Sequence, residues 1–242
     1  MEASVDHALE TANERRQEAA TRLIHCYEEL AKRNENLLQR VVGNQTFEHW
    51  GRYPSPDHVD EHSGFQYYYH AHSPDDRPGV RENGHFHTFA RLDHKARPVQ
   101  DWFMPATDNV PQVCEQDDTT VHLVAISVDA HGLPFEIFTV NQWVTGDRWC
   151  TGESIASLAQ AFRVDRAGPR LVADWLASFF TLYETEIRDL IDARDQRIRR
   201  LIAANGQDHR ITQDHSIEVL SAAALSFAAD VDAALRGSCR VA

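Results

Sequence analysis

Histidine is the residue type with the clearest chemical signal in this sequence. Of the 14 histidines in 242 residues, eight lie between positions 49 and 94, and four of these form two His-x-His pairs. The pairs are His70-Ala71-His72 and His85-Phe86-His87. On a β-strand, side chains at i and i+2 point to the same face with Cα atoms about 6–7 Å apart. Each pair could therefore present two imidazoles to one metal ion.

The segments that carry the pairs have the composition of strands. Residues 64–72 are rich in aromatic residues, and residues 85–92 alternate so that the two histidines of the pair share a face. If the two strands are neighbours, all four histidines share one surface. We therefore predict a transition-metal site in which three of the four act as ligands and the fourth contacts a ligand or a substrate. Iron or zinc is favoured, and copper, manganese and nickel are also compatible with imidazole.

Other interpretations of this histidine cluster stay open. The histidines could form a polar strand face in contact with solvent, or they could hydrogen-bond to backbone carbonyl groups. His122 lies on a further predicted strand and could be another metal ligand or a hydrogen-bonded core residue. Glu136 and Asn141 could supply an oxygen ligand or orient an imidazole. Tyr68 shares the face of the first pair, where it could donate a proton or simply pack.

Further residues have weaker claims. His58 and His62 belong to a segment with several acidic residues, which could cover the site or be a solvated turn. Cys150 could join the metal site. The predicted surface histidines are His94, His131, His209 and His215. The cysteines, which are widely spaced and predicted to be free thiols, are Cys26, Cys114, Cys150 and Cys239.

Composition excludes several function classes. The formal net charge of −13 argues against nucleic acid and anionic membrane surfaces as partners. No stretch approaches the roughly 20 apolar residues of a membrane span, and the first residues have no apolar signal region. A cytoplasmic location is expected. The sequence lacks the GxSxG, GxxxxGK[ST], GxGxxG and HExxH motifs, so hydrolase triads, nucleotide loops and zincin chemistry have no support.

Hydrophobic periodicity predicts an α+β fold with an antiparallel β-sheet in the middle of the chain. At least four strands are expected, and the segments are 64–72, 85–92, 119–129 and 133–145, with Ala130-His131-Gly132 as a hairpin turn. An amphipathic helix is predicted over residues 4–42, ending at Gly43. The organisation is a helical segment (1–45), a His-rich β-region (46–152) and a helical region (153–242), expected to form one compact domain.

The C-terminal region is predicted to be entirely helical. Ser154 could cap a short helix to Phe162, and Pro169 suits the start of a long helix. The apolar stripe of that helix runs from Val172 to Ile202, and the helix ends near residues 205–206. A final helix is expected over residues 221–236. The long helices could mediate a homodimer.

Four blocks of this sequence resemble an uncharacterised bacterial family, classed as a domain of unknown function. The blocks are HWGRYP (49–54), SGFQYYYHAH (63–72), NGHFHTFARL (83–92) and VHLVAISVDAHGLPFEIFTVNQWVTGDRW (121–149). The resemblance implies a bacterial intracellular protein and implies no activity. The His-x-His pairs are also similar to the metal-binding strand of cupins, but the glutamate that follows in cupins is replaced by Asp75 and Asp76 after Pro74.

Three hypotheses about function follow. The first is a non-haem metalloenzyme, an iron or zinc oxidoreductase or hydrolase that acts on a small-molecule substrate, with Tyr68 and Glu136 as candidate catalytic residues. The second is a non-catalytic protein that binds or senses a metal or haem. The third is a helical partner-binding protein in which the histidines are incidental.

Overall fold

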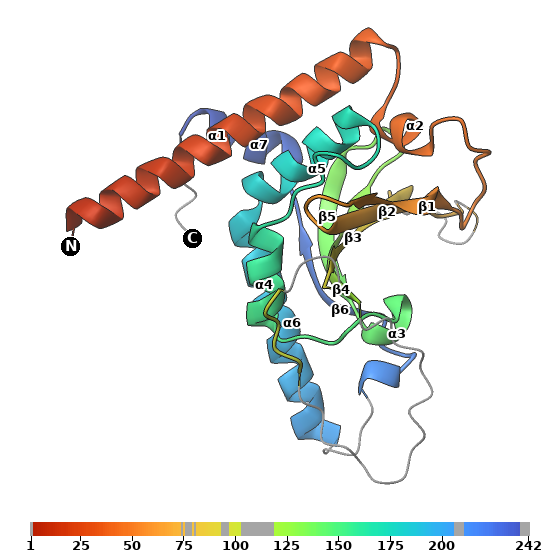
Figure 1. Ribbon diagram of the computed structural model, residues 1–242, viewed down its shortest axis with the longest axis vertical. Coiled ribbons are helices and arrows are strands. Elements are labelled where there is room, and N and C mark those ends of the chain that lie inside the picture. The colour runs from red at the N-terminus through yellow and green to blue at the C-terminus, as the bar shows by residue number, and fades with distance from the viewer. Residues whose placement is uncertain are drawn as a thin grey trace.

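The computed structural model is an α+β structure with a β-sheet from the middle of the chain and helices from both ends (Figure 1). It describes residues 2–73, 75, 79, 81–92, 97–102, 119–205 and 211–237, with side chains from residue 10 onward. The predicted fold class is thus confirmed. Among the described residues, no helix combines the length and the apolarity that a membrane crossing requires.

The sheet has six antiparallel strands arranged in the order in which they occur along the chain. The strands are β1 (Arg52–Asp60), β2 (Phe65–Ala71), β3 (Gly84–Arg91), β4 (Thr120–Val128), β5 (Pro134–Val140) and β6 (Val219–Ala224). Each strand therefore pairs with its sequence neighbour, and β2 and β3, which carry the His-x-His pairs, lie side by side.

The four predicted strands are present, and two strands were missed. The edge strand β1 contains Pro54 and Pro56, which disfavour a strand in the sequence but are tolerated at a sheet edge. The edge strand β6 lies where residues 221–236 were predicted to be one helix. Its small residues pack on helix α6 (Glu184–Asn205), and the Ser221 hydroxyl donates to the Leu190 carbonyl over 2.8 Å. Here tertiary packing outweighs the helix propensity of alanine.

The predicted strand 133–145 ends earlier than expected. Asn141 accepts the N–H of Gln142 and caps a short helix, α3 (Gln142–Thr145). The hairpin turn before β5 is confirmed, because Gly132 adopts a φ of 76° and donates its N–H to the Asp129 carbonyl over 2.8 Å. Part of the loop 73–84 lies outside the described residues, as do His94, His209, Cys114 and Cys239.

The long predicted helices are each divided in two. The remaining helices are α1 (Glu2–Lys32), α2 (Leu37–Val42), α4 (Gly152–Gln160), α5 (Arg170–Leu182) and α7 (Phe227–Leu235), with a 3₁₀ turn at Ile211–Gln213. Asn34 has a φ of 55°, which interrupts the first helix, and Asn36 forms a capping box that starts α2. Gly43 ends α2 as predicted.

The C-terminal stripe is interrupted at Tyr183, which lies between α5 and α6. Its buried hydroxyl donates to Asp230 of α7 over 3.2 Å. Pro169 immediately precedes α5, as predicted, whereas α4 is capped by Thr151 and not by Ser154. The apolar periodicity continues through both breaks, so the sequence pattern alone could not locate them.

One face of the sheet is covered by helices. Helices α4, α5 and α6 stand along one side of the sheet, and α1 crosses near its end (Figure 1). Phe86 of β3 contacts Trp175 of α5, with ring centroids 5.5 Å apart. The Trp175 indole donates to the Tyr27 hydroxyl, which donates to the Gly132 carbonyl, both over 2.9 Å. This chain of bonds joins α5, α1 and the β4–β5 turn.

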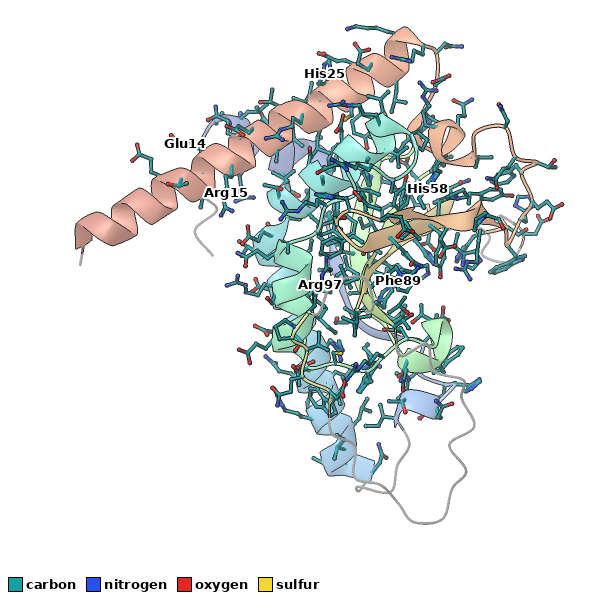
Figure 2. The ribbon with its side chains drawn as sticks, viewed as in Figure 1. Glu14, Arg15, His25, His58, Phe89 and Arg97 are labelled. Atoms are coloured by element: carbon teal, nitrogen blue, oxygen red, sulfur yellow. The ribbon has the colours of Figure 1, made fainter. Side chains whose placement is uncertain are left out.

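Helix α1 has an outer side without contacts to the sheet. Glu14 and His25 are exposed and point away from the body of the protein (Figure 2). Arg15 approaches Glu184 of α6 at 3.8 Å, an ion pair with an exposed arginine that contributes little stability. The inner side carries the buried residues that contact the core, namely Ala19, Ala20, Leu23, Cys26 and Leu30.

Asp60 joins the β1–β2 turn to the segment between α4 and α5. Its carboxylate accepts the backbone N–H groups of His62 (2.9 Å), Ser63 (3.1 Å) and Arg166 (3.0 Å). Burial alone would raise the pKa of Asp60, but these hydrogen bonds lower it below its usual value. The stabilisation is therefore complete above the unfolded-state pKa and is lost as the pH falls through the folded-state pKa.

We predict that Asp60→Asn lowers the free energy of unfolding by about 1.5–3 kcal/mol at pH 7, since an amide in either orientation leaves at least one N–H without an acceptor. The difference from wild type should shrink below about pH 4 as the wild-type carboxyl is protonated. Urea unfolding of the two proteins at pH 7 and below about pH 4 measures this difference in the free energy of unfolding. The control is Asp174→Asn, which alters only an exposed ion pair with Arg170. A difference that grows with acidity would contradict the prediction.

Candidate metal centre

The strand register places the predicted site residues on one face of the sheet, opposite the helices. His70 lies directly opposite His85, and Tyr68 lies opposite His87. His122 reaches this face because a bulge shifts the β3–β4 register between His87 and Phe89. We call this surface the histidine face, formed by Tyr68, His70, His72, His85, His87 and His122.

Three imidazoles of the histidine face lie close enough to share one ion. His70, His72 and His85 each offer a nitrogen, and these atoms lie within 4.8 Å of one another. The ring centroids are 5.1 Å apart for His70 and His72, 5.4 Å for His70 and His85, and 4.8 Å for His72 and His85. We call these residues the His triad. It contains the whole first His-x-His pair and half of the second.

Glu82 stands beside the His triad and orients one member. The Nδ1 of His85 lies 3.1 Å from Oε1 of Glu82, and because a carboxylate only accepts, this nitrogen donates. In the neutral form of this ring, Nε2 then carries the lone pair. Ser127, which lies opposite His85 on β4, donates to the same carboxylate oxygen over 2.7 Å. The other carboxylate oxygen is 3.6 Å from Nδ1 of His72.

His87 pairs with His122 and is not part of the His triad. The Nδ1 of His87 lies 3.0 Å from Nε2 of His122, so one of the two rings donates to the other. The backbone N–H of His122 donates to Asp147 over 2.6 Å. The His87 ring also lies 4.5 Å from the His85 ring and 4.9 Å from the Tyr68 ring. His87 therefore lies between the His triad and the buried His122.

The electrostatics keep His70, His87 and His122 neutral and the Glu82 carboxylate ionised. Burial, followed by the charges that His85, His72 and Arg52 can carry, lowers the pKa of His70 to about 4. Burial and the His85 charge lower the pKa of His122 to about 3, and the pKa of His87 also lies well below its usual value. Burial acts to raise the pKa of Glu82, but its interactions with His85 and Ser127 outweigh this and bring it to about 2. Deprotonated donors are the form that metals bind.

The remaining oxygen candidates differ in position. Glu136 lies opposite Ser127 on the histidine face, half-buried, and its pKa is raised by burial and by the charge of Glu82. Asn141 is buried away from this face and donates to the Ile211 and Ile217 carbonyls, so the expectation that it serves the site is wrong. Tyr68 packs against His87 and lies below the guanidinium of Arg52, and burial raises its pKa to about 12.

Other predicted residues lie elsewhere. His58, expected in a loop, belongs to β1, where its ring packs on Tyr67 at 5.2 Å on the helix side. His62 lies in the β1–β2 turn. Cys150 is a free thiol beside Asp101, outside the His triad, and Cys26 is also free and buried. His131 and His215 are exposed, as predicted.

Sequence reasoning missed several residues around the site. Glu82 lies between the two predicted strands, and its position three residues before His85 is the signal in the sequence that could have identified it. Arg52 and Trp50 were not considered because β1 was not recognised. Trp50 contacts the rings of His72 at 5.1 Å and His70 at 5.8 Å. Asp147 follows α3, and only the tertiary structure brings it to His122.

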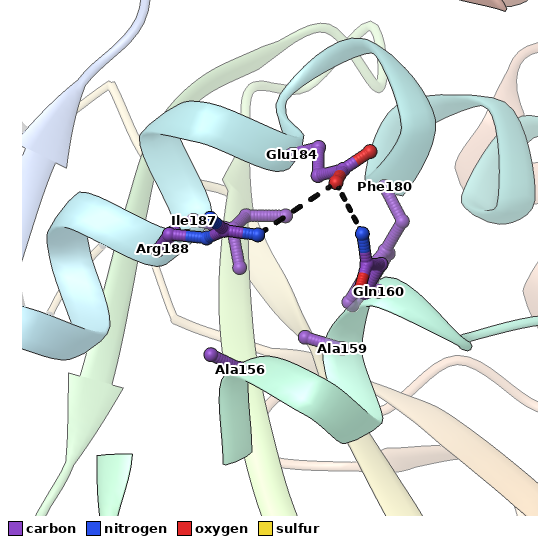
Figure 3. A pocket seen from close by; sticks show the side chains of 7 residues that line it. All are labelled: Ala156, Ala159, Gln160, Phe180, Glu184, Ile187 and Arg188. Carbon is purple, nitrogen blue, oxygen red and sulfur yellow. Dashed lines mark hydrogen bonds and ion pairs between the residues drawn. The ribbon is translucent and has the colours of Figure 1, made fainter. Parts of the chain in front are cut away.

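A small hollow lies among the helices, away from the histidine face. It is formed where α4, α5 and α6 meet (Figure 3). In it, Glu184 accepts a hydrogen bond from Gln160 over 2.8 Å and pairs with Arg188 at 3.9 Å. The charges of this hollow are thus compensated within it, whereas the histidine face gathers imidazole donors.

Comparison with known proteins agrees with the resemblance seen in the sequence. Residues 17–225 match a family described as a domain of unknown function (DUF6969). This span includes every strand of the sheet and the whole histidine face. No curated protein and no solved structure matches the chain.

We predict that His122 stays neutral in the metal-free protein from pH 8 down to about pH 4.5, since its pKa is about 3. The ring carbon and hydrogen chemical shifts, followed by NMR after chelator treatment, should not titrate over this range. The His122 ring resonances are assigned by their absence from the spectrum of the His122→Gln variant. A midpoint near the ordinary value of about 6.5 would contradict the buried pair.

Proposed function

We propose that this chain, which belongs to the DUF6969 family, is a metalloenzyme that binds one divalent transition-metal ion through His70, His72 and His85. The observation that carries the proposal is the convergence of three imidazole nitrogens within 4.8 Å of one another on one face of the sheet. Three imidazole ligands that leave a position for water are the donor set of many catalytic zinc sites.

The surroundings of the His triad support zinc over iron. Metal-binding histidines usually donate their second ring nitrogen to a carboxylate or carbonyl group, which fixes the ring and raises its basicity. Glu82 has this relation to His85, with Ser127 holding the carboxylate. Non-haem iron sites typically use two histidines and one carboxylate as direct ligands. Here Glu82 interacts with the nitrogens of the imidazoles, and three histidines converge.

The proposed site is suited to catalysis as well as storage. His87 is engaged with His122, which argues against a closed site of four histidines. His70 is only half-buried, while His72 and His85 are buried, so the triad has a side that a small molecule can approach. A bound divalent ion supplies Lewis acidity and lowers the pKa of its water. Glu136, on the same face, is a candidate to accept a proton there.

We predict that the wild-type protein, purified without an affinity tag or nickel column, contains about one equivalent of metal by ICP-MS, with zinc favoured. His70→Ala combined with His85→Ala should remove stoichiometric metal, because one imidazole cannot hold the ion. Circular dichroism should show that the double variant remains folded.

The matched control removes two other histidines. His131→Ala combined with His215→Ala takes away two exposed imidazoles outside the triad and should leave the metal content unchanged. Metal retained by His70→Ala/His85→Ala, or wild-type protein that stays metal-free after reconstitution with Zn(II) and anaerobic Fe(II), would reject the site.

We further predict that Glu82→Gln weakens zinc affinity by about 10- to 100-fold, the usual effect of losing a carboxylate that orients a metal-binding histidine. The stoichiometry should stay at one, since all three ligands remain. Competition with a chromogenic chelator measures the affinity. Glu136→Gln is the control, a carboxylate on the same face without a hydrogen bond to the triad, and should have a much smaller effect. An equal loss of zinc affinity in both variants would show that the negative charge of Glu82 matters and its hydrogen bond to His85 does not.

A further inference from the structure

The rim of the His triad carries two exposed residues that no metal ligation requires. The first is Trp50, whose ring contacts the rings of His70 and His72. The second is Arg52, which lies opposite His70 in the β1–β2 register. Trp50 is 51% exposed, and the Arg52 side chain is 55% exposed. A large aromatic ring and a cation in contact with solvent beside a metal site are the groups that recognise a ligand.

The backbone holds Trp50 in a costly conformation. Its φ is 66°, in the left-handed region that bulky residues rarely adopt because of steric strain. The N–H of Trp50 donates to the Ala71 carbonyl over 2.9 Å, and the Ala71 N–H donates to the Gly51 carbonyl over 3.0 Å. These bonds tie the strained residue directly to the strand that carries His70 and His72.

The residues on either side of Trp50 are equally fixed. The Tyr53 hydroxyl bonds to the backbone of Glu48 and to the Thr46 carbonyl. A Cβ on Gly51 would lie 2.5 Å from that hydroxyl, so only glycine fits there. The segment therefore presents an exposed indole in one orientation. Burial cannot explain this arrangement, because half of the side chain is exposed.

Arg52 is also held in place. Its Nη2 bonds to both carboxylate oxygens of Asp57, at 3.1 Å and 3.0 Å, and Gln66 donates to Asp57 over 3.0 Å. The guanidinium carbon lies 3.8 Å from the centre of the Tyr68 ring. Only Nη2 makes these bonds, so the planar fork keeps donors for a second carboxylate. This fixed positive charge stands out in a chain of net charge −13.

We propose that the substrate of this site is a small carboxylate with a flat, apolar body, whose carboxylate is drawn to Arg52 and the metal and whose body packs on Trp50. This inference rests on the proposed metal function and names its substrate class. The indole offers a flat apolar surface, and the guanidinium fork matches a carboxylate in shape and charge. Asp57 engages only one nitrogen of the Arg52 fork, so the fork can also bind a ligand carboxylate, which a neutral or cationic ligand does not supply.

The test uses the full-length protein loaded with Co(II), whose visible absorption reports changes at the metal. The probes are benzoate, acetate and benzamide. We expect benzoate to change the spectrum and to saturate, acetate to bind more weakly, and benzamide to have no effect at the same concentrations. Arg52→Gln should weaken benzoate and acetate alike by about tenfold, which corresponds to about 1.4 kcal/mol, with Co(II) content unchanged.

The second variant separates the aromatic part. Trp50→Gly removes the ring and permits a φ of 66° without strain, so the protein should fold at least as well as wild type. It should weaken benzoate about three- to tenfold, in line with the value of an aromatic pair, and leave acetate unchanged. The controls are Phe47→Ala, an exposed ring stacked on Tyr53, and Arg170→Gln, an exposed cation on α5; neither should alter benzoate binding.

The outcomes distinguish the two proposals. Wild-type protein that takes up no Co(II) would reject the metal site itself. Normal Co(II) uptake with no spectral response to benzoate would reject only the carboxylate class. Loss of Co(II) in Arg52→Gln would make the arginine structural and overturn its assigned role. Equal binding of acetate and benzoate, with no effect of Trp50→Gly, would overturn the role of the indole.

Discussion

The site depends on the antiparallel pairing of β2 with β3. This register sets His70 opposite His85 and Tyr68 opposite His87. Because side chains alternate across a sheet, a shift of either strand by one residue would send the histidines of that strand to the helix side and its core aromatics outward. The buried aromatic residues on the helix side, such as Tyr69 and Phe86, oppose that shift. The hydrophobic core and the donor cluster are therefore two consequences of one register.

Gathering imidazoles in a buried place has an electrostatic cost, and the structure shows how it is limited. A charged imidazole is disfavoured here by burial and by its neighbours, so the rings of His70, His87 and His122 are neutral. Glu82 is an ionised group placed beside them, and it is stabilised by His85 and Ser127. The result is a set of lone pairs with one negative charge beside it, an environment that favours a cation over protons.

The helices act on this site indirectly. The bonds from Trp175 to Tyr27 and on to Gly132 fix the β4–β5 turn against α1 and α5. Strand β4 carries both Ser127 and His122, and its bulge brings His122 to the histidine face. The exposed residues beside the triad, Trp50 and Arg52, come from the edge of the sheet, where β1 and the residues before it lie beside β2. The centre of the sheet thus supplies the donors, and the edge supplies the exposed groups that we propose recognise the substrate.

The sequence by itself determined the fold class, four of the strands and the two His-x-His pairs, because these follow from period-two alternation and turn chemistry, which are local. Tertiary structure alone decided which three imidazoles converge, since that depends on register and on the bulge in β4. It also decided that Ser221 lies in a strand, through packing on α6, and that Asn141 caps a helix. Glu82, Trp50 and Arg52 reach the site through strand pairing, and contacts between distant segments have no signature in a local pattern.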